Sequence, residues 1–271
     1  MSSATQSPIW GAWSIEPGEW ARWEIGSLIL YARPRRKEWA FAWHSSEEAS
    51  LDSVSVQNPS PEPPDETSCQ FARVAGDNMP SKMRLAPRLG DRAFVVRPDL
   101  RLSLPAGQQT VLFISTVLWV TVSIELDATE STQATLLDVP AARPSDTWFG
   151  PNTLEGELCY ASRTNARTDL AEIGPRPHRA VTPVEIFNRG IDALDVEQLR
   201  VPVSTLRLYD SADGRIWTDS VRFIRDKGER EAQLEISEAS DHLPSELRQI
   251  SEPRHTAEVG TIVAAFSRFL G

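Results

Sequence analysis

The sequence predicts an all-β protein, made of one or two sandwich-like β units with a single C-terminal amphipathic helix. From residue 69 onward, short apolar runs alternate with turn residues, a spacing typical of sandwiches and barrels rather than of βαβ units. A Trp-rich hairpin pattern precedes these runs. Helical spacing of apolar residues occurs only at the end of the chain, so we expect one helix there.

Composition supports a folded protein. Of 271 residues, 40% are hydrophobic and 24% are charged, which is ordinary globular usage and permits a sizeable core. The formal net charge is −10, from 28 basic and 38 acidic side chains. Because nucleic-acid binding depends on clustered Lys and Arg, we expect no nucleic-acid partner.

We expect four consecutive segments along the chain. Residues 1–68 hold a Trp-rich N-terminal hairpin region and an acidic Pro-rich loop, and residues 69–145 form a first β unit that packs with the hairpin. Residues 146–250 form a second β unit, and residues 251–271 form the terminal helix. Residues 45–68 contain four prolines and few bulky apolar groups, so we expect a mobile loop or linker there.

The first hairpin is predicted around the basic turn at residues 33–37. After this turn Trp39, Phe41 and Trp43 alternate with other residues, which places the three rings on one face of a strand. Six of the nine Trp lie within the first 43 residues. An exposed row of indoles can bind sugars or partners, but Trp at strand spacing more often packs inside a core, and we favour packing.

Further strands are predicted where apolar runs lie between turn residues. The runs are residues 69–75, 91–97, 99–104, 110–126, 134–139, 154–161, 181–188, 206–209, 216–225 and 232–237. Asp213-Gly214 lies between two of these runs and predicts a hairpin. The run at 111–126 is too short and too rich in Ser and Thr for a spanning helix, so we expect a buried strand and no transmembrane segment.

The two ends of the chain carry different signals. Residues 1–13 have no basic region followed by an apolar stretch, so we expect no secretory signal and a cytoplasmic location. Cys69 and Cys159 are then expected as reduced thiols, and their spacing does not suit zinc. Ser251 is the expected cap of the terminal helix, whose apolar residues are Val259, Ile262, Val263, Phe266 and Leu270.

The densest polar segment, residues 145–179, is the expected site. If residues 154–161 form a strand, Glu155 and Glu157 lie about 7 Å apart on one surface. Carboxylates at that separation can hold a metal, transfer protons or anchor guanidinium groups. The candidate ligand-binding residues are Asp146, Trp148, Asn152, Glu155, Glu157, Arg163, Arg176 and His178. For the same Glu and Arg side chains, the pattern favours a structural network that holds a loop against the sheet edge over a ligand-binding surface.

Several motifs in this part of the chain resemble an uncharacterised prokaryotic family, Domain of Unknown Function 432. The motifs are Gly-Asp-Arg at residues 90–92, residues 145–153 continuing into 155–160, and Arg-Pro-His-Arg at 176–179 followed by Pro183 and Asn188. The resemblance implies that the segment from Asp146 to Tyr160 is important. It implies no activity, substrate or catalytic residue.

The sequence favours a non-catalytic binding or interaction protein that uses residues 145–179, with a small anionic ligand or a protein as partner. We expect no catalytic residue, cofactor or metal, because no nucleophile and base occur at a recognisable spacing. One alternative is an enzyme acting on a carbohydrate or phosphate ester, with Glu155 and Glu157 as the acid/base pair or as metal ligands. Another is a scaffold that self-associates through the Trp face or the terminal helix; the sequence does not determine the oligomeric state.

Overall fold

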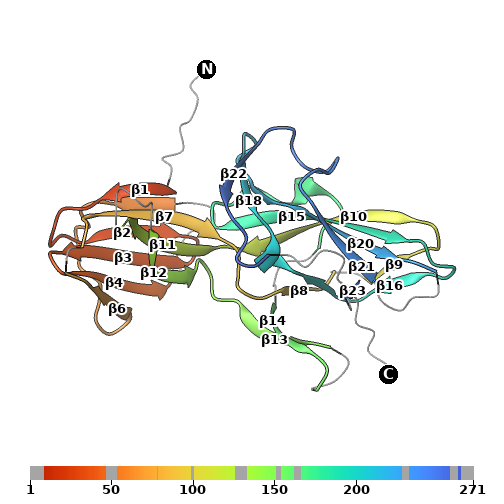
Figure 1. Ribbon diagram of the computed structural model, residues 1–271, viewed down its shortest axis with the longest axis horizontal. Coiled ribbons are helices and arrows are strands. Elements are labelled where there is room, and N and C mark those ends of the chain that lie inside the picture. Colours follow the sequence, from red (N-terminus) through yellow and green to blue (C-terminus); the bar gives the residue numbers. More distant parts are fainter. Residues whose placement is uncertain are drawn as a thin grey trace. The chain divides into compact units, whose positions relative to one another are not determined.

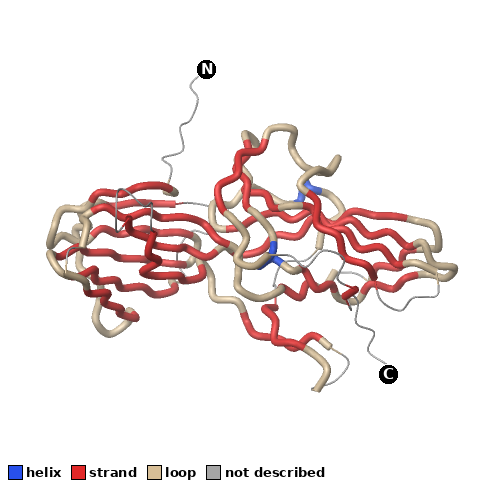
Figure 2. Tube along the Cα trace, in the orientation of Figure 1, coloured by secondary structure: helices blue, strands red, loops and turns tan. Residues whose placement is uncertain are grey.

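A computed structural model describes most of the chain, namely residues 9–46, 54–77, 79–98, 101–125, 133–150, 154–161, 166–227, 232–256 and 262–263. Regular structure in these ranges is almost entirely strand (Figure 2). The helical turns among them are two short 3-10 segments, Leu170–Glu172 (η1) and Val203–Thr205 (η2). The predicted all-β class is confirmed.

The chain forms two compact units, each assembled from separate stretches of sequence (Figure 1). Unit 1 comprises Met1–Pro87 and Trp119–Arg143, and unit 2 comprises Arg88–Leu118 and Pro144–Gly271. The apolar run that was expected as one buried strand is therefore two strands. β10 (Gln109–Val117) belongs to unit 2 and β11 (Trp119–Glu125) belongs to unit 1.

Unit 1 contains two sheets. The five-stranded sheet has the order β5-β2-β3-β4-β6 and consists of β2 (Ala21–Ile25), β3 (Leu28–Arg35), β4 (Glu38–Ser45), β5 (Val54–Gln57) and β6 (Gln70–Ala75). The four-stranded sheet has the order β1-β7-β11-β12, with β1 (Gly11–Ser14), β7 (Lys82–Arg88) and β12 (Gln133–Pro140). The predicted N-terminal hairpin is confirmed, because β3 and β4 pair antiparallel from Arg35↔Glu38 onward.

One indole of β2 and one of β4 pack in the interior of unit 1. Trp23 and Trp39 are fully buried, and the Trp39 ring stacks on Phe41 at a centroid separation of 5.9 Å. The Nε1–H of Trp39 donates a hydrogen bond of 2.9 Å to the carbonyl of Pro80, so its polar group is satisfied inside the core. The aromatic row on β4 is thus mainly a packing feature, as the strand spacing favoured.

Part of the acidic Pro-rich segment belongs to the five-stranded sheet. Val54–Gln57 forms β5, which pairs antiparallel with β2. Beyond β5, the amide of Ser60 donates to the carbonyl of Trp20 at 2.6 Å, and Pro64 is buried. These contacts offset the ordering entropy that favoured a mobile loop, so the described part of the segment is attached to the sheet.

Unit 2 is built around an eight-stranded sheet. β10 pairs antiparallel along its whole length with the long central strand β15 (Arg179–Asn188). The remaining order is β22-β18-β19-β15-β20-β21-β23, with β18 (Leu208–Ser211), β19 (Ile216–Thr218), β20 (Ser220–Arg225) and β21 (Ala232–Ser237). The hairpin predicted at Asp213-Gly214 is confirmed, because β18 and β19 pair antiparallel and Gly214 adopts a φ of +78°.

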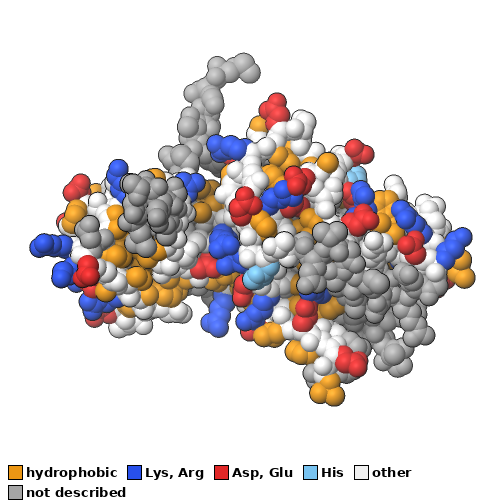
Figure 3. Space-filling view, in the orientation of Figure 1, with side chains coloured by type: hydrophobic (Ala, Val, Ile, Leu, Met, Phe, Trp, Pro, Cys, Tyr) orange, Lys and Arg blue, Asp and Glu red, His pale blue; other side chains and the backbone are white. Residues whose placement is uncertain are grey.

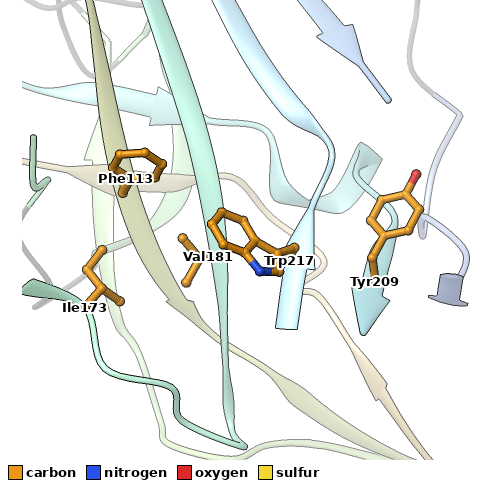
Figure 4. Packing of buried hydrophobic residues seen from close by; sticks show 5 residues of the cluster. All are labelled: Phe113, Ile173, Val181, Tyr209 and Trp217. Carbon is orange, nitrogen blue, oxygen red and sulfur yellow. The ribbon is translucent and has the colours of Figure 1, made fainter. Parts of the chain in front are cut away.

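Aromatic and aliphatic side chains from several elements pack on one face of this sheet. Figure 4 shows the buried cluster, which consists of Phe113, Ile173, Val181, Tyr209 and Trp217. Leu170 of η1 and Leu243 and Leu247, which follow β21, pack against it. This part of the core is therefore formed by residues that are far apart in the sequence.

The predicted C-terminal helix is wrong for the described residues. Leu247–Ser251 forms β22 beside β18, and Ile262–Val263 forms β23, which pairs antiparallel with β21. Val259, Phe266 and Leu270 lie outside the described residues. Isoleucine and valine are residue types with a high strand propensity, and the edge of β21 offers backbone groups for pairing.

Two smaller sheets complete unit 2. One has the order β13-β14-β8-β17, with β8 (Phe94–Val96), β13 (Ser145–Phe149), β14 (Glu157–Ala161) and β17 (Leu199–Val201). The other pairs β9 (Leu102–Leu104) with β16 (Leu194–Val196). Within the described ranges, no helix has the length and apolar character needed to cross a bilayer.

Candidate functional site

The polar segment singled out in the sequence begins with an antiparallel hairpin of β13 and β14. Trp148 lies opposite Leu158, and Asp146 lies opposite Tyr160. β14 continues into the sheet through parallel pairing with β8, which β17 borders on its other side. In Figure 1 the hairpin extends from β8 away from the other strands of unit 2. Side-chain alternation gives this small sheet two faces of different character.

One face of the hairpin is buried. Phe149 and Cys159 pack with Ala93 and Val95, and Cys159 has no exposed surface. Burial raises the pKa of the Cys159 thiol to about 11, so the thiol stays protonated near neutral pH. This cysteine is a packing residue and is not an activated nucleophile.

Glu157, a predicted site residue, is held by Arg200 of β17. The guanidinium Nη2 donates to Oε2 of Glu157 at 2.9 Å, and its Nε donates to Oε1. The Cys159 thiol donates a third bond to Oε1 at 3.3 Å. A bidentate pair of this kind links β14 to β17 and uses the carboxylate oxygens internally. The Glu157–Arg200 pair is of the kind expected in the structural network that the sequence favoured for this cluster.

Glu155 does not share a strand face with Glu157. β14 begins at Glu157, and Glu155 lies exposed in the bend before it. The chain doubles back tightly here, because a Cβ added to Gly150 would lie only 2.4 Å from the backbone oxygen of Glu155. This close approach ends the strand pairing at Phe149↔Glu157. The predicted pair of carboxylates on one strand surface is therefore not formed.

The other face of the hairpin exposes large apolar side chains. The cross-strand neighbours Trp148 and Leu158 are 43% and 47% exposed, and Leu154 in the bend is 93% exposed. Figure 3 shows hydrophobic side chains gathered over the β13–β14 hairpin at the lower edge of the view. Most large apolar side chains of the described ranges are covered, so this concentration is a distinctive surface feature.

Charged and aromatic groups lie beside the apolar pair on the same face. The guanidinium of Arg92 contacts the carboxylate of Asp146 at 3.2 Å and lies 5.2 Å from the ring centroid of Tyr160. The Tyr160 hydroxyl donates to Oδ1 of Asp91 at 2.7 Å. Burial, reinforced by this bond, raises the pKa of Tyr160 to about 12. We call Arg92, Asp146, Trp148, Leu154, Leu158 and Tyr160 the hairpin surface.

The other candidate residues are placed elsewhere. Arg176 and His178 lie just before β15, which is a strand of the eight-stranded sheet. His178 is 1% exposed, and its backbone carbonyl accepts a 2.9 Å hydrogen bond from the amide of Leu118. Asn152 and Arg163 lie outside the described residues. Of the predicted set, the hairpin therefore places Asp146 and Trp148 together on its exposed face.

Sequence reasoning did not include Asp91, Arg92, Tyr160 or Arg200 among the site residues. Tyr160 and Arg92 become neighbours of Asp146 only through the register of β13, β14 and β8. Arg200 is 43 positions from Glu157 in the sequence. Alternation along β14 puts Tyr160 on the strand face opposite to that of Glu157. Nothing in the local pattern, however, identifies Arg200 as the partner of Glu157.

The hairpin surface contains side chains of several chemical types. It combines a guanidinium, a carboxylate, a phenol and exposed apolar groups, and its charged members already pair with one another. Among the described residues, no group of three or more His, Cys, Asp or Glu side chains is arranged to hold a metal ion.

Comparison with curated proteins and with solved structures yields no match for this chain. Comparison with protein families yields a match that extends over residues 9–270 and so includes both units and the hairpin. The chain thus belongs to the family described as "Protein of unknown function (DUF432)".

Proposed function

We propose that this chain is a non-catalytic binding protein and that the hairpin surface binds an apolar segment of a protein partner. The observation that carries the proposal is the exposed pair of Trp148 and Leu158, directly opposite each other on a projecting hairpin. Transfer of these side chains from water into a partner would supply a hydrophobic driving force.

The composition of the hairpin surface supports a protein partner. Trp, Tyr and Arg are the residues that contribute most often to the energetic centre of protein interfaces. Trp148 and Leu158 form the apolar centre, while Arg92, Asp146 and Tyr160 supply a polar border. A desolvated apolar centre with a polar border is the usual anatomy of an interface.

The shape of the surface favours a protein over a small molecule. Small ligands bind in concave pockets that enclose most of their surface. Trp148 and Leu158 instead lie on the face of a two-stranded hairpin, and Leu154 is almost fully exposed in its bend. A flat or convex apolar surface gains burial only from a partner large enough to cover it.

Site-specific photo-crosslinking tests the proposal. A benzoylphenylalanine at Leu154 is expected to form a defined adduct with one protein in cells of the source organism, and Trp148→Ala in the same chain should remove that adduct. The matched control is Phe71, an aromatic residue of unit 1 that is 48% exposed, close to the 43% of Trp148. Benzoylphenylalanine at position 71 should not capture the same protein, and Phe71→Ala should leave the Leu154 adduct intact.

The captured protein, once purified, is then titrated against the wild-type chain and its variants. Trp148→Ala should weaken the Kd about 30-fold, corresponding to a loss of about 2 kcal/mol at an interface centre. Phe71→Ala should leave the Kd unchanged. Equal weakening by both variants, or no effect of Trp148→Ala, would refute the proposed role of the hairpin. An adduct with only a second copy of this chain would replace the proposal by self-association.

A further inference from the structure

A hollow of about 370 Å³ lies at one end of the strands of unit 1. Its walls come from the ends of β3, β4, β6 and β12 and from the residues that follow β12. Small-molecule sites in proteins have volumes of about 300–1,000 Å³, so the hollow is at the small end of that range. All of its lining residues belong to unit 1, so it is separate from the hairpin surface.

The register of the five-stranded sheet explains why this hollow is partly apolar. Trp39, Phe41 and Trp43 alternate along β4, and the first two rings are fully buried. Trp43 is the last of the row and remains only half-buried, because the hollow lies against it. Leu28 and Pro140 line the hollow as well. These groups provide an apolar wall that includes an indole.

Polar groups surround this apolar wall. Ser45 lies opposite Leu28, and Gln70 lies opposite Trp43, so both side chains share the strand face that borders the hollow. His44 also borders it, but alternation along β4 directs its ring to the other face. Within the described part of the chain, neither Gln70 nor Arg143 uses its side chain in a hydrogen bond or an ion pair.

The charged side chains around the hollow favour a ligand with a negative charge. Arg143 is an exposed guanidinium at its border, and none of the lining residues is Asp or Glu. The whole chain has a formal charge of −10, yet no acidic side chain lines this hollow beside the cation. A single Arg presents a planar donor pair that matches one carboxylate, whereas phosphate sites usually gather several cations or backbone amides.

We propose that this hollow is a binding site for a small amphipathic carboxylate with a flat apolar body. The carboxylate pairs with Arg143 and the amide of Gln70, and the apolar body lies against Trp43. At about 30 Å³ per water-sized group, the volume admits a ligand of about a dozen non-hydrogen atoms. The inference does not depend on the proposed role of the hairpin, since it rests on a different unit.

The probe is 2-naphthoate, which combines a carboxylate with a flat apolar body of suitable size. It should bind the full-length chain with a Kd of about 1 mM, as expected for a ligand of this size without optimised contacts. Uncharged 2-naphthamide, and acetate, which lacks the flat apolar body, should each bind at least about tenfold more weakly. In NMR titrations, the naphthoate should shift the Trp43 indole N–H, which is assigned by its loss in Trp43→Phe.

Arg143→Gln is the decisive variant, because Arg143 is exposed and its replacement should not affect folding. It should weaken naphthoate binding about tenfold and leave naphthamide binding unchanged. Arg84, an exposed arginine on β7 of the same unit, provides the control, and Arg84→Gln should bind naphthoate as the wild type does. Absence of naphthoate binding at 10 mM (about ten times the expected Kd), equal affinity for the naphthamide, or unchanged binding by Arg143→Gln would each overturn the proposal.

Discussion

Glu185 is a buried carboxylate that accepts hydrogen bonds from three side chains of unit 2, two on β20 and one that follows β21. Its Oε1 accepts from Ser220 Oγ at 3.1 Å and from Ser240 Oγ at 2.6 Å, and its Oε2 accepts from Arg222 Nη2 at 3.0 Å. Burial opposes ionisation, but the bonds from Ser240, Arg222 and Ser220 outweigh it. The pKa of Glu185 therefore lies below its ordinary value of 4.5.

We expect Glu185→Gln to lower the free energy of unfolding by about 2 kcal/mol at pH 7, because the neutral amide removes the charge that pairs with Arg222 and replaces one accepting oxygen with an NH2 donor. A depressed folded-state pKa contributes stability above the unfolded value, and that contribution is lost as pH falls through the folded value. The difference between wild type and variant should therefore shrink below pH 4.5. Urea denaturation across this pH range measures it.

Glu235 supplies the control for this prediction. It also faces Arg222, at 3.6 Å, but its side chain is 44% exposed. Solvent screens such pairs, so Glu235→Gln should change stability by less than about 1 kcal/mol. Similar losses for the two variants, or a Glu185→Gln effect independent of pH, would contradict the role assigned to Glu185.

Residue types at the site were more predictable than their partners. Asp146 and Trp148 were identified as candidates from the sequence and lie together on the exposed face of the hairpin. Glu157 was identified on the same grounds, but the fold pairs it with Arg200. An ionic partner from a distant strand follows from the tertiary register, which composition and spacing along one strand do not contain.

At the scale of elements, the break between β19 and β20 has a specific cause. The sequence predicted one strand over residues 216–225, and both β19 and β20 do pair parallel with β15. Asp219 interrupts them, because its buried carboxylate accepts bonds of 2.8 Å from the Tyr209 hydroxyl and the Arg207 amide. A short polar side chain that binds nearby groups in this way competes with regular strand pairing.

The β13–β14 hairpin depends on the absence of a side chain at Gly156. A Cβ added there would lie 2.4 Å from Trp148 Nε1 and 2.7 Å from the backbone oxygen of Phe149. A ring can rotate away, but a backbone oxygen moves only if the hairpin opens. Gly156→Ala should therefore destabilise the hairpin by about 1–3 kcal/mol and displace Trp148.

Hydrogen exchange of the β13 and β14 amides and the emission of Trp148 measure this change. The matched control is Gly174→Ala, because a Cβ added at Gly174 meets no atom within 4 Å and its φ is not in the left-handed region. This control should leave hairpin exchange unchanged. If Gly156→Ala exchanges like the wild type, the close approach of the two strands is not a requirement of the hairpin.

At the scale of the whole molecule, each unit is assembled from discontinuous sequence. Unit 1 needs β11 and β12 from residues 119–143 to complete the four-stranded sheet that begins with β1 and β7. Composition predicted segments that follow one another along the chain. Local sequence patterns do not show that the chain leaves one unit and later returns to it. The division at Leu118 falls inside a continuous apolar run.

A fragment of residues 1–87 should therefore be unfolded. It contains β1 and β7 but lacks β11 and β12, which complete their sheet. Val120 and Val122 on β11 are fully buried in the intact chain, so the fragment lacks part of the core. Far-UV circular dichroism and amide dispersion in NMR spectra measure the outcome. A fragment of residues 1–143 retains all strands of unit 1 and should keep strand signal; a folded 1–87 fragment would contradict this account.

Local sequence alone determined the all-β class, the β3–β4 and β18–β19 hairpins, and the aromatic row of β4, because alternation and turn residues act over a few positions. The tertiary structure decided which strands are neighbours. It placed Ile262–Val263 against β21 as a strand where helical spacing predicted a helix, and it left Trp148 and Leu158 exposed while Glu157 was bound by Arg200. These outcomes depend on backbone pairing and burial between residues far apart in the chain, and such long-range contacts leave no periodic signal in the sequence.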